Sequence, residues 1–284
     1  MKTGALPLSG PVVSPPMVVA ARSTKLDELH RLVAVTGGAV VAFSGGTDST
    51  LVAAIAARAL PGRSLAVTAV SPSLPPGELE AARDVAGEIG IPHRAVRTNE
   101  VRQEAYLENG ADRCYHCKFE LYGVLAGVAR EERLPAVVSG TNADDVGDYR
   151  PGLRAAAERG VYHPLVEAGM TKSDVRAASA ALGLSTWDKP ASACLSSRIA
   201  FGVRITVEEL SKVGRAEKLL KELGFRQVRV RIHGDLVRVE VEIADLPRLA
   251  DQDVRERVTG ELKRLGYRYV TLDLEGFRSG SMNP

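Results

Sequence analysis

The stretch AVVAFSGGTDST, residues 39–50, decides how this chain folds. It begins with small and β-branched apolar residues, which are typical of a buried strand, and it ends in a segment with helical spacing. Gly45 and Gly46 lie between the two and can adopt backbone conformations closed to other residues. A strand that turns directly into a helix leaves free N–H groups at the positive end of the helix dipole. The stretch therefore predicts a phosphate site.

The predicted phosphate site consists of six consecutive residues: Ser44, Gly45, Gly46, Thr47, Asp48 and Ser49. The hydroxyls of Ser44 and Ser49 can add donors to a bound anion. The same residue types also cap helices in ordinary turns, in which case Asp48 would be only a cap. The Lys of the pattern GxxxxGK[ST] is missing, which argues against transfer of a γ-phosphate.

Short β-rich runs alternate with helical patterns beyond this site. Runs at 64–70, 93–98 and 136–140 each precede a helical or loop stretch, and residues 48–60 and 77–90 show helical spacing. The alternation predicts an α/β domain over residues 23–202, with a parallel sheet of five strands and helices on both faces. Thr171 and Asp174 predict a capping box at the start of a further helix.

The pattern changes after Gly202. We expect a helix over 206–223, strands over 227–232 and 236–243, a helix over 247–264 and a strand over 268–274, which form a smaller α+β domain over 203–284. Alternation in the two strands puts Arg229, Arg231 and Glu240 on one side of the hairpin, and such charges ordinarily form a solvated face. Residues 1–22, broken by Pro, Gly and Ser, predict a flexible tail.

The composition is that of a soluble globular protein, with 45% hydrophobic and 25% charged residues. No apolar run approaches the roughly 20 residues of a membrane helix, so we expect no membrane contact and a cytoplasmic location. Residues 203–284 hold 16 Lys/Arg and 14 Asp/Glu, which leaves 21 of each sign in residues 1–202. This balance gives no support to a nucleic-acid partner.

A second polar stretch, SGTNADDVGDYRPG at 139–152, follows an apolar strand. Ligands in open parallel sheets bind at the carboxyl ends of the strands. We therefore place Gly140, Asn142 and Asp145 beside the bound phosphates, and we expect Asp145, with Asp144 or Asp148, to help hold Mg²⁺ on them. The alternative is a solvated turn.

Three cysteines cannot all pair within one chain. Cys114 and Cys117 have a spacing that indicates metal or redox chemistry in a reducing compartment. Cys194 lies in a loop rich in Pro and Ser beside Arg198, a setting that can stabilise a thiolate. A buried apolar role for Cys194 is the plainer alternative.

Five stretches together resemble the LarE family of ATP-dependent sulfur transferases: SGGTDS, RCYHC, GTNADDVGDYRPG, WDKPASACLSSRI and FRSGSMN. The likeness covers about residues 25–282, and SGGTDS alone resembles the signature of all PP-loop ATP pyrophosphatases. The resemblance implies that ATP is cleaved between its α- and β-phosphates. A carboxylate of pyridinium-3,5-biscarboxylic acid mononucleotide would be adenylated and then converted to a thiocarboxylate for the nickel-pincer cofactor of lactate racemase.

The resemblance also implies where the sulfur comes from. In sacrificial members, a cysteine that matches Cys194 forms a thioester and then loses its own sulfur, leaving dehydroalanine. Three cysteines resemble the branch in which Cys114, Cys117 and Cys194 hold a [4Fe-4S] cluster, whose open iron carries an added sulfide. A Zn²⁺ site completed by His116 or His163, or reduced thiols with no metal, are the alternatives.

The family further implies a substrate pocket lined by Arg198, Glu217, Arg229, Arg231, Glu240 and Arg278, and assembly into a homo-oligomer. Arginine forks suit phosphate and carboxylate groups. Three rival functions remain open on the residues. A tRNA thiolase would need a basic surface, an amide synthetase would use ammonia as the nucleophile, and a nucleotide sensor would transfer nothing.

Overall fold

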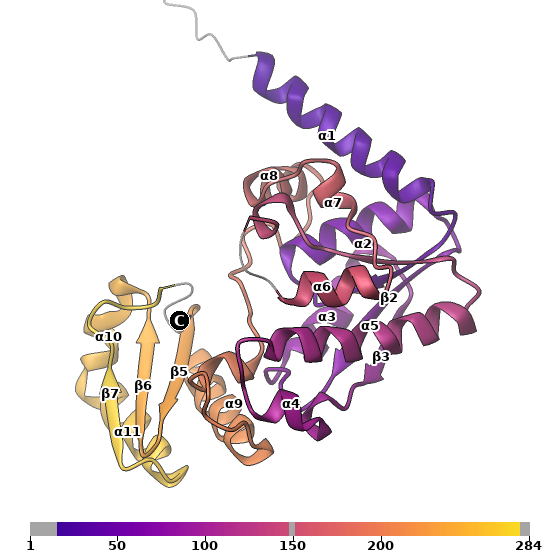
Figure 1. Cartoon of the computed structure of the whole chain (residues 1–284). Coiled ribbons are helices and arrows are strands. Elements are labelled where there is room, and N and C mark those ends of the chain that lie inside the picture. Colours follow the sequence, from indigo (N-terminus) through magenta and orange to yellow (C-terminus); the bar gives the residue numbers. More distant parts are fainter. Residues whose placement is uncertain (1–15, 148–150, 279–284) are drawn as a thin grey trace, which may run out of the picture.

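A computed structural model describes residues 16–147 and 151–278 of the chain (Figure 1). The first sheet has parallel strands in the order β3-β2-β1-β4. Its strands are β1 (Ala39–Ala42), β2 (Ser64–Val70), β3 (His93–Arg97) and β4 (Ala136–Ser139). Central strand β1 pairs on both sides, so that Val40 lies opposite Leu65 and Val137. The parallel α/β sheet is confirmed.

Helices cover both faces of this sheet. The helices of this unit are α1 (Pro16–Ala34), α2 (Thr47–Ala59), α3 (Glu78–Ile89), α4 (Glu104–Leu107), α5 (Arg113–Glu131), α6 (Pro151–Glu158), α7 (Pro164–Glu167) and α8 (Lys172–Ala181). Alternate side chains of a strand face opposite sides. Val41 accordingly packs in one core with Leu51 of α2, whereas Val40 packs in another with Leu125 of α5. The capping box of Thr171 and Asp174 at the start of α8 is confirmed.

The prediction of five strands is wrong in the part of the chain that the structure describes, because the fifth strand is reduced to one residue. Tyr162 forms an isolated parallel bridge to Val138, and its N–H donates to the Val137 carbonyl at 2.9 Å. Pro164 follows and begins α7. Proline has no N–H to donate, so the ladder stops there.

The C-terminal unit contains a small mixed sheet in the order β5-β6-β7. Its elements are α9 (Val207–Glu222), β5 (Val228–His233), β6 (Leu236–Val241), α10 (Leu246–Ala250), α11 (Gln252–Arg264) and β7 (Tyr269–Leu272). Strands β5 and β6 are antiparallel, and β7 joins β6 in parallel. The helix predicted over 247–264 is divided at Asp251, whose side chain accepts the Asp253 N–H at 3.2 Å and starts a new helix.

Residues from before position 202 complete the core of this unit. Tyr106, Leu195 and Ile199 pack with the apolar residues of α9 and β5. Helix α9 lies between the small sheet and the first unit (Figure 1). A Cβ at Gly214 of α9 would lie 3.2 Å from Leu195 and Pro76, so the missing side chain lets the helix approach. We propose that the boundary between the two domains lies between residues 202 and 203.

The N-terminal segment differs from the predicted tail over residues 1–22. Residues 1–15 lie outside the described residues, but α1 begins at Pro16 and so includes residues 16–22. Proline is well tolerated in the first turn of a helix, and no Gly or Pro follows it until Gly37. Among the helices described, none is both long and apolar enough to cross a membrane.

Candidate active site

The loop between β1 and α2 has the geometry of an anion site. Gly45 has a φ of 66°, and a Cβ there would lie 3.0 Å from the Ala82 backbone, so this position needs glycine. No side chain caps α2 at Gly46, which leaves the first N–H groups of the helix available. The hydroxyls of Ser44 and Ser49 lie 3.1 Å apart beside them.

The end of β4 lies directly against the start of α2. A Cβ at Gly140 would stand 2.7 Å from the Ser49 nitrogen, so only glycine fits this approach. Asn142 Nδ2 then donates to Asp48 Oδ1 at 3.2 Å. The Asn142 N–H donates to Asp145 Oδ2 at 3.0 Å in a capping box. The structure thus brings the two predicted nucleotide stretches together, while Asp148 lies outside the described residues.

Two lysines at the phosphate loop were missed by sequence reasoning. Lys172 Nζ lies 2.5 Å from Asp48 Oδ2, and Lys189 Nζ lies 3.2 Å from the Gly45 carbonyl oxygen. Lys189 also contacts Glu78 at 3.1 Å. Both lysines belong to segments far along the chain, where no local pattern links them to the loop. The string WDKP around Lys189 was the only feature of the sequence that could have pointed to either lysine.

The three cysteines lie in one region of the molecule. Arg113, which precedes Cys114 at the start of α5, donates through Nη1 to the Ser196 carbonyl at 3.0 Å and so joins the two cysteine segments. Burial raises the pKa of the Cys117 thiol to about 12, and the nearby Cys194 thiol acts in the same direction. The Leu195 N–H donates to the Ser73 carbonyl at 2.8 Å, which fixes the Cys194 loop to the loop that follows β2.

No group of three His, Cys, Asp or Glu side chains in the described ranges is close enough to hold a metal by itself. His116 faces Asp112 at 3.2 Å, and His163 Nδ1 lies 2.7 Å from the Ser139 hydroxyl at the end of β4. Burial lowers the pKa of His163, and the charge of Lys118 adds to this effect. The two histidines therefore have other partners than the thiols. Thiols are the soft ligands that iron–sulfur clusters use, but the three cysteines do not form a metal-binding group within the described ranges.

Two ion pairs of the predicted substrate cluster are buried rather than solvated. The Arg198 guanidinium binds both oxygens of Glu217, at 2.7 and 2.8 Å, and Arg231 binds both oxygens of Glu240, at 3.0 Å. Glu240 is 0% exposed. The expectation of a solvated face was wrong because this side of the hairpin packs against the loop after Cys194, where Arg231 also donates to the Ser197 carbonyl.

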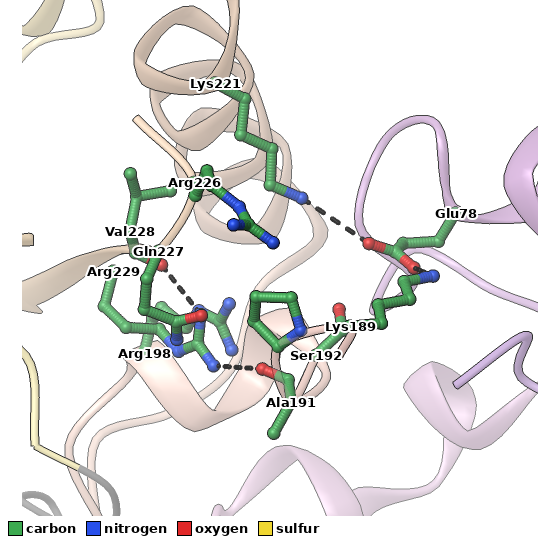
Figure 2. A pocket seen from close by; sticks show the side chains of 11 residues that line it. Glu78, Lys189, Ala191, Ser192, Arg198, Lys221, Arg226, Gln227, Val228 and Arg229 are labelled. Carbon is green, nitrogen blue, oxygen red and sulfur yellow. Dashed lines mark hydrogen bonds and ion pairs between the residues drawn. The ribbon is translucent and has the colours of Figure 1, made fainter. Parts of the chain in front are cut away.

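Arg229 opens onto a small pocket between this hairpin and the loop that carries Lys189 (Figure 2). It donates to the carbonyls of Val228 and Ala191 and stacks over the Phe277 ring. Burial lowers the pKa of Arg229 to about 10, and the charge of Arg198 adds to this effect. The charged groups that line the pocket are Glu78, Lys189, Arg198, Lys221, Arg226 and Arg229. The pocket is therefore suited to an anion.

Arg278 stands apart from this pocket in the structure. Its guanidinium pairs with Glu275 at 2.6 Å and lies 3.8 Å from Asp273. The side chain is 49% exposed. Of the other predicted substrate residues, Arg198 and Arg229 line the pocket, whereas Glu217, Arg231 and Glu240 are held in the two buried ion pairs.

Comparison with known proteins identifies the nucleotide end of the site. The family model for asparagine synthase matches residues 35–121, which include the phosphate loop. A tRNA-specific 2-thiouridylase of Caulobacter vibrioides is 30% identical over 192 residues, 53% of this chain and 50% of that protein. The parallel sheet, the glycine loop and these matches define a PP-loop ATP pyrophosphatase-type enzyme that uses ATP.

Two longer matches identify the family. An uncharacterised protein of Synechocystis sp. is 47% identical over 264 residues, 92% of this chain and 97% of the relative. The pyridinium-3,5-bisthiocarboxylic acid mononucleotide synthase of Lactiplantibacillus plantarum is 42% identical over 246 residues, 86% of this chain and 88% of that enzyme. The chain belongs to the LarE family and is an ATP-dependent sulfurtransferase.

Proposed function

We propose that this enzyme adenylates the carboxylates of pyridinium-3,5-biscarboxylic acid mononucleotide and replaces an oxygen of each by sulfur. The main support is the 42% identity that extends over 88% of a synthase named for the corresponding bisthiocarboxylate. The match to the thiouridylase covers about half of the chain, at 30% identity. The product would then serve the maturation of the nickel-pincer cofactor of lactate racemase.

The anionic substrate suits the junction between the two units. The pocket beside Arg229 is lined by five cationic side chains and one carboxylate. A mononucleotide with a phosphate and two carboxylates would add negative charge to a pocket in which cations outnumber carboxylates. ATP would lie on the phosphate loop, with Mg²⁺ held by the pyrophosphate oxygens and Asp145, since Mg²⁺ needs few protein carboxylates when phosphate is bound.

Two sources of sulfur are compatible with the three thiols. In the first, the Cys194 thiolate attacks the acyl-adenylate, AMP leaves, and the thioester loses the Cβ–S bond of Cys194 together with its α-proton. The products are a thiocarboxylate and dehydroalanine. In the second, Cys114, Cys117 and Cys194 hold a [4Fe-4S] cluster, which would supply an iron-bound sulfide as the sulfur donor.

One experiment tests the function and separates these sources. The protein is purified without oxygen, its visible spectrum and its iron and zinc contents are recorded, and its intact mass is measured before and after reaction with ATP and the pyridinium substrate. Loss of the elements of H₂S shows that Cys194 is consumed. Bound iron, repeated turnover and an unchanged mass support the cluster. Pyrophosphate release without any thiocarboxylate contradicts the proposed function.

The variants Cys194→Ser and Cys114→Ser form a matched pair for this experiment. On the sacrificial route, Cys114→Ser keeps its single turnover and Cys194→Ser makes no thiocarboxylate. On the cluster route, both variants lose iron and activity. Amide formation from ammonia by Cys194→Ala would favour an amide synthetase, and salt-sensitive binding of tRNA would favour a thiolase. Light scattering tests the expected homo-oligomer.

A further inference from the structure

Lys189 is held at the phosphate loop by the fold of its own segment. The Lys189 N–H donates to the Thr186 carbonyl at 3.1 Å, and the same carbonyl accepts the Thr47 hydroxyl at 2.9 Å. Thr47 is the first residue of α2 and is 3% exposed. The segment that carries Lys189 is therefore fixed to the start of the helix that forms the anion site.

The Lys189 ammonium joins that anion site to the pocket of the C-terminal unit. Nζ lies 3.2 Å from the Gly45 carbonyl and 3.1 Å from Glu78 Oε2. Its side chain is 24% exposed, and that of Glu78 is 12% exposed. Burial alone would raise the pKa of Glu78, but the charge and hydrogen bond of Lys189 lower it. Glu78 is thus ionised and holds the lysine charge beside the pocket (Figure 2).

The other lysines nearby do not share this position. Lys172 pairs with Asp48, on the side of the loop toward α8. Lys221 of α9 reaches Glu78 only at 3.5 Å and is 40% exposed. Among the pocket-lining cations, Lys189 is the one for which the structure records a hydrogen bond to the glycine loop in the described residues. It stands where a nucleotide on the loop and an acid in the pocket would meet.

We propose that Lys189 is a catalytic residue that binds the α-phosphate of ATP while the carboxylate attacks it, and that Glu78 holds the lysine in place before the nucleotide arrives. The inference rests on the proposed function. A carboxylate oxygen bonds to the α-phosphorus, the bond from that phosphorus to the pyrophosphate oxygen breaks, and pyrophosphate leaves with the electron pair. Charge grows on the non-bridging oxygens meanwhile, and a fixed cation stabilises it. The lysine keeps its proton throughout.

The test compares Lys189→Met and Lys189→Arg with Lys218→Met, which removes an exposed cation of α9 that does not line the pocket. The assay follows AMP and pyrophosphate release with the pyridinium dicarboxylate mononucleotide. We expect kcat of Lys189→Met to fall by about 100-fold or more, because one preorganised donor contributes on that order. The KM for ATP should change by less than about fivefold, since the contact strengthens in the transition state. Lys189→Arg should recover part of the loss.

Sulfur substitution at the α-phosphate separates a direct contact from a structural role. Wild type should react with one diastereomer of ATPαS more slowly than with the other, and Lys189→Met should lose most of this preference. Equal losses in Lys189→Met and Lys218→Met, or a preference that is unchanged in Lys189→Met, would overturn the inference. If wild type itself releases no pyrophosphate with the pyridinium substrate, the proposed function fails instead.

Discussion

Removal of the Glu217 carboxylate should destabilise the junction between the two units. Glu217 is 2% exposed and Arg198 is 1% exposed, so neither charge is solvated. In Glu217→Ala, the Arg198 guanidinium loses two hydrogen bonds, and the Val230 N–H, 3.0 Å from Glu217 Oε1, loses its acceptor. Within the described part of the chain, the hydrogen bonds that remain to Arg198 are those of Nη1 to two carbonyls and to Ser197.

The expected loss follows from an uncompensated charge in a buried place. Breaking a buried pair by removing one partner typically costs about 3–5 kcal/mol. We therefore expect Glu217→Ala to lower the free energy of unfolding by about that amount. Replacement of both partners in Arg198→Met/Glu217→Leu should restore part of it, because no charge then remains buried. Glu222→Ala, which removes the surface partner of Lys218, should cost about 0.5 kcal/mol or less.

The assay is urea unfolding followed by far-UV circular dichroism on all three variants. Arg198 also bonds the Ala193 and Cys194 carbonyls, so thiocarboxylate formation should fall in Glu217→Ala even where the protein is folded. A Glu217→Ala protein within 1 kcal/mol of wild type, on the order of a single ordinary hydrogen bond, would refute the reasoning.

Gly140→Ala should destabilise the protein by about 1–3 kcal/mol and weaken ATP binding, because its Cβ would meet the Ser49 nitrogen at 2.7 Å. Thermal unfolding measures the stability and calorimetry measures ATP binding. The control is Gly147→Ala, whose added Cβ would meet nothing within 4 Å. Burial alone would raise the pKa of Asp174, but hydrogen bonds from Lys25 and Thr171 lower it from 3.8 to about 2. The stabilising effect of the Asp174 carboxylate is therefore present above about pH 4 and is lost as the pH falls toward 2. Asp174→Asn should be less stable than wild type at pH 6, by less than about 1 kcal/mol because the pair lies near the surface. The difference in unfolding free energy should vanish when both proteins are titrated with acid. In metal-free protein at pH 8, iodoacetamide should modify the exposed Cys114 well before Cys117, whose pKa is about 12; equal rates in peptide mapping would contradict this burial.

Local signals were sufficient for the first unit and for the phosphate loop. A strand, two glycines and a helix start are neighbours in sequence, so the β1–α2 turn could be predicted from residues 39–50 alone. The capping box at Thr171 is equally local. The number of strands in the sheet could not be predicted from local signals. In the described structure, the fifth strand is reduced to Tyr162, which forms a single bridge to β4 just before Pro164.

Contacts between distant segments could not be predicted in the same way. A period of two places Arg229 and Arg231 on one side of β5, but it does not say that the loop after Cys194 covers that side. Lys172 lies 124 residues along the chain from its partner Asp48, and Lys189 lies 144 residues from its partner Gly45. Single lysines outside a motif give no pattern that would reveal such contacts.

The pairing of Arg198 with Glu217 limits where the chain can be truncated or joined to a relative. A fragment that ends at residue 202 would retain the Arg198 guanidinium but not the Glu217 carboxylate that neutralises it. The C-terminal end of this fragment would also expose Leu195 and Ile199, which would lack their apolar neighbours. Chimeras between relatives should therefore exchange the segment around Cys194 together with everything that follows it.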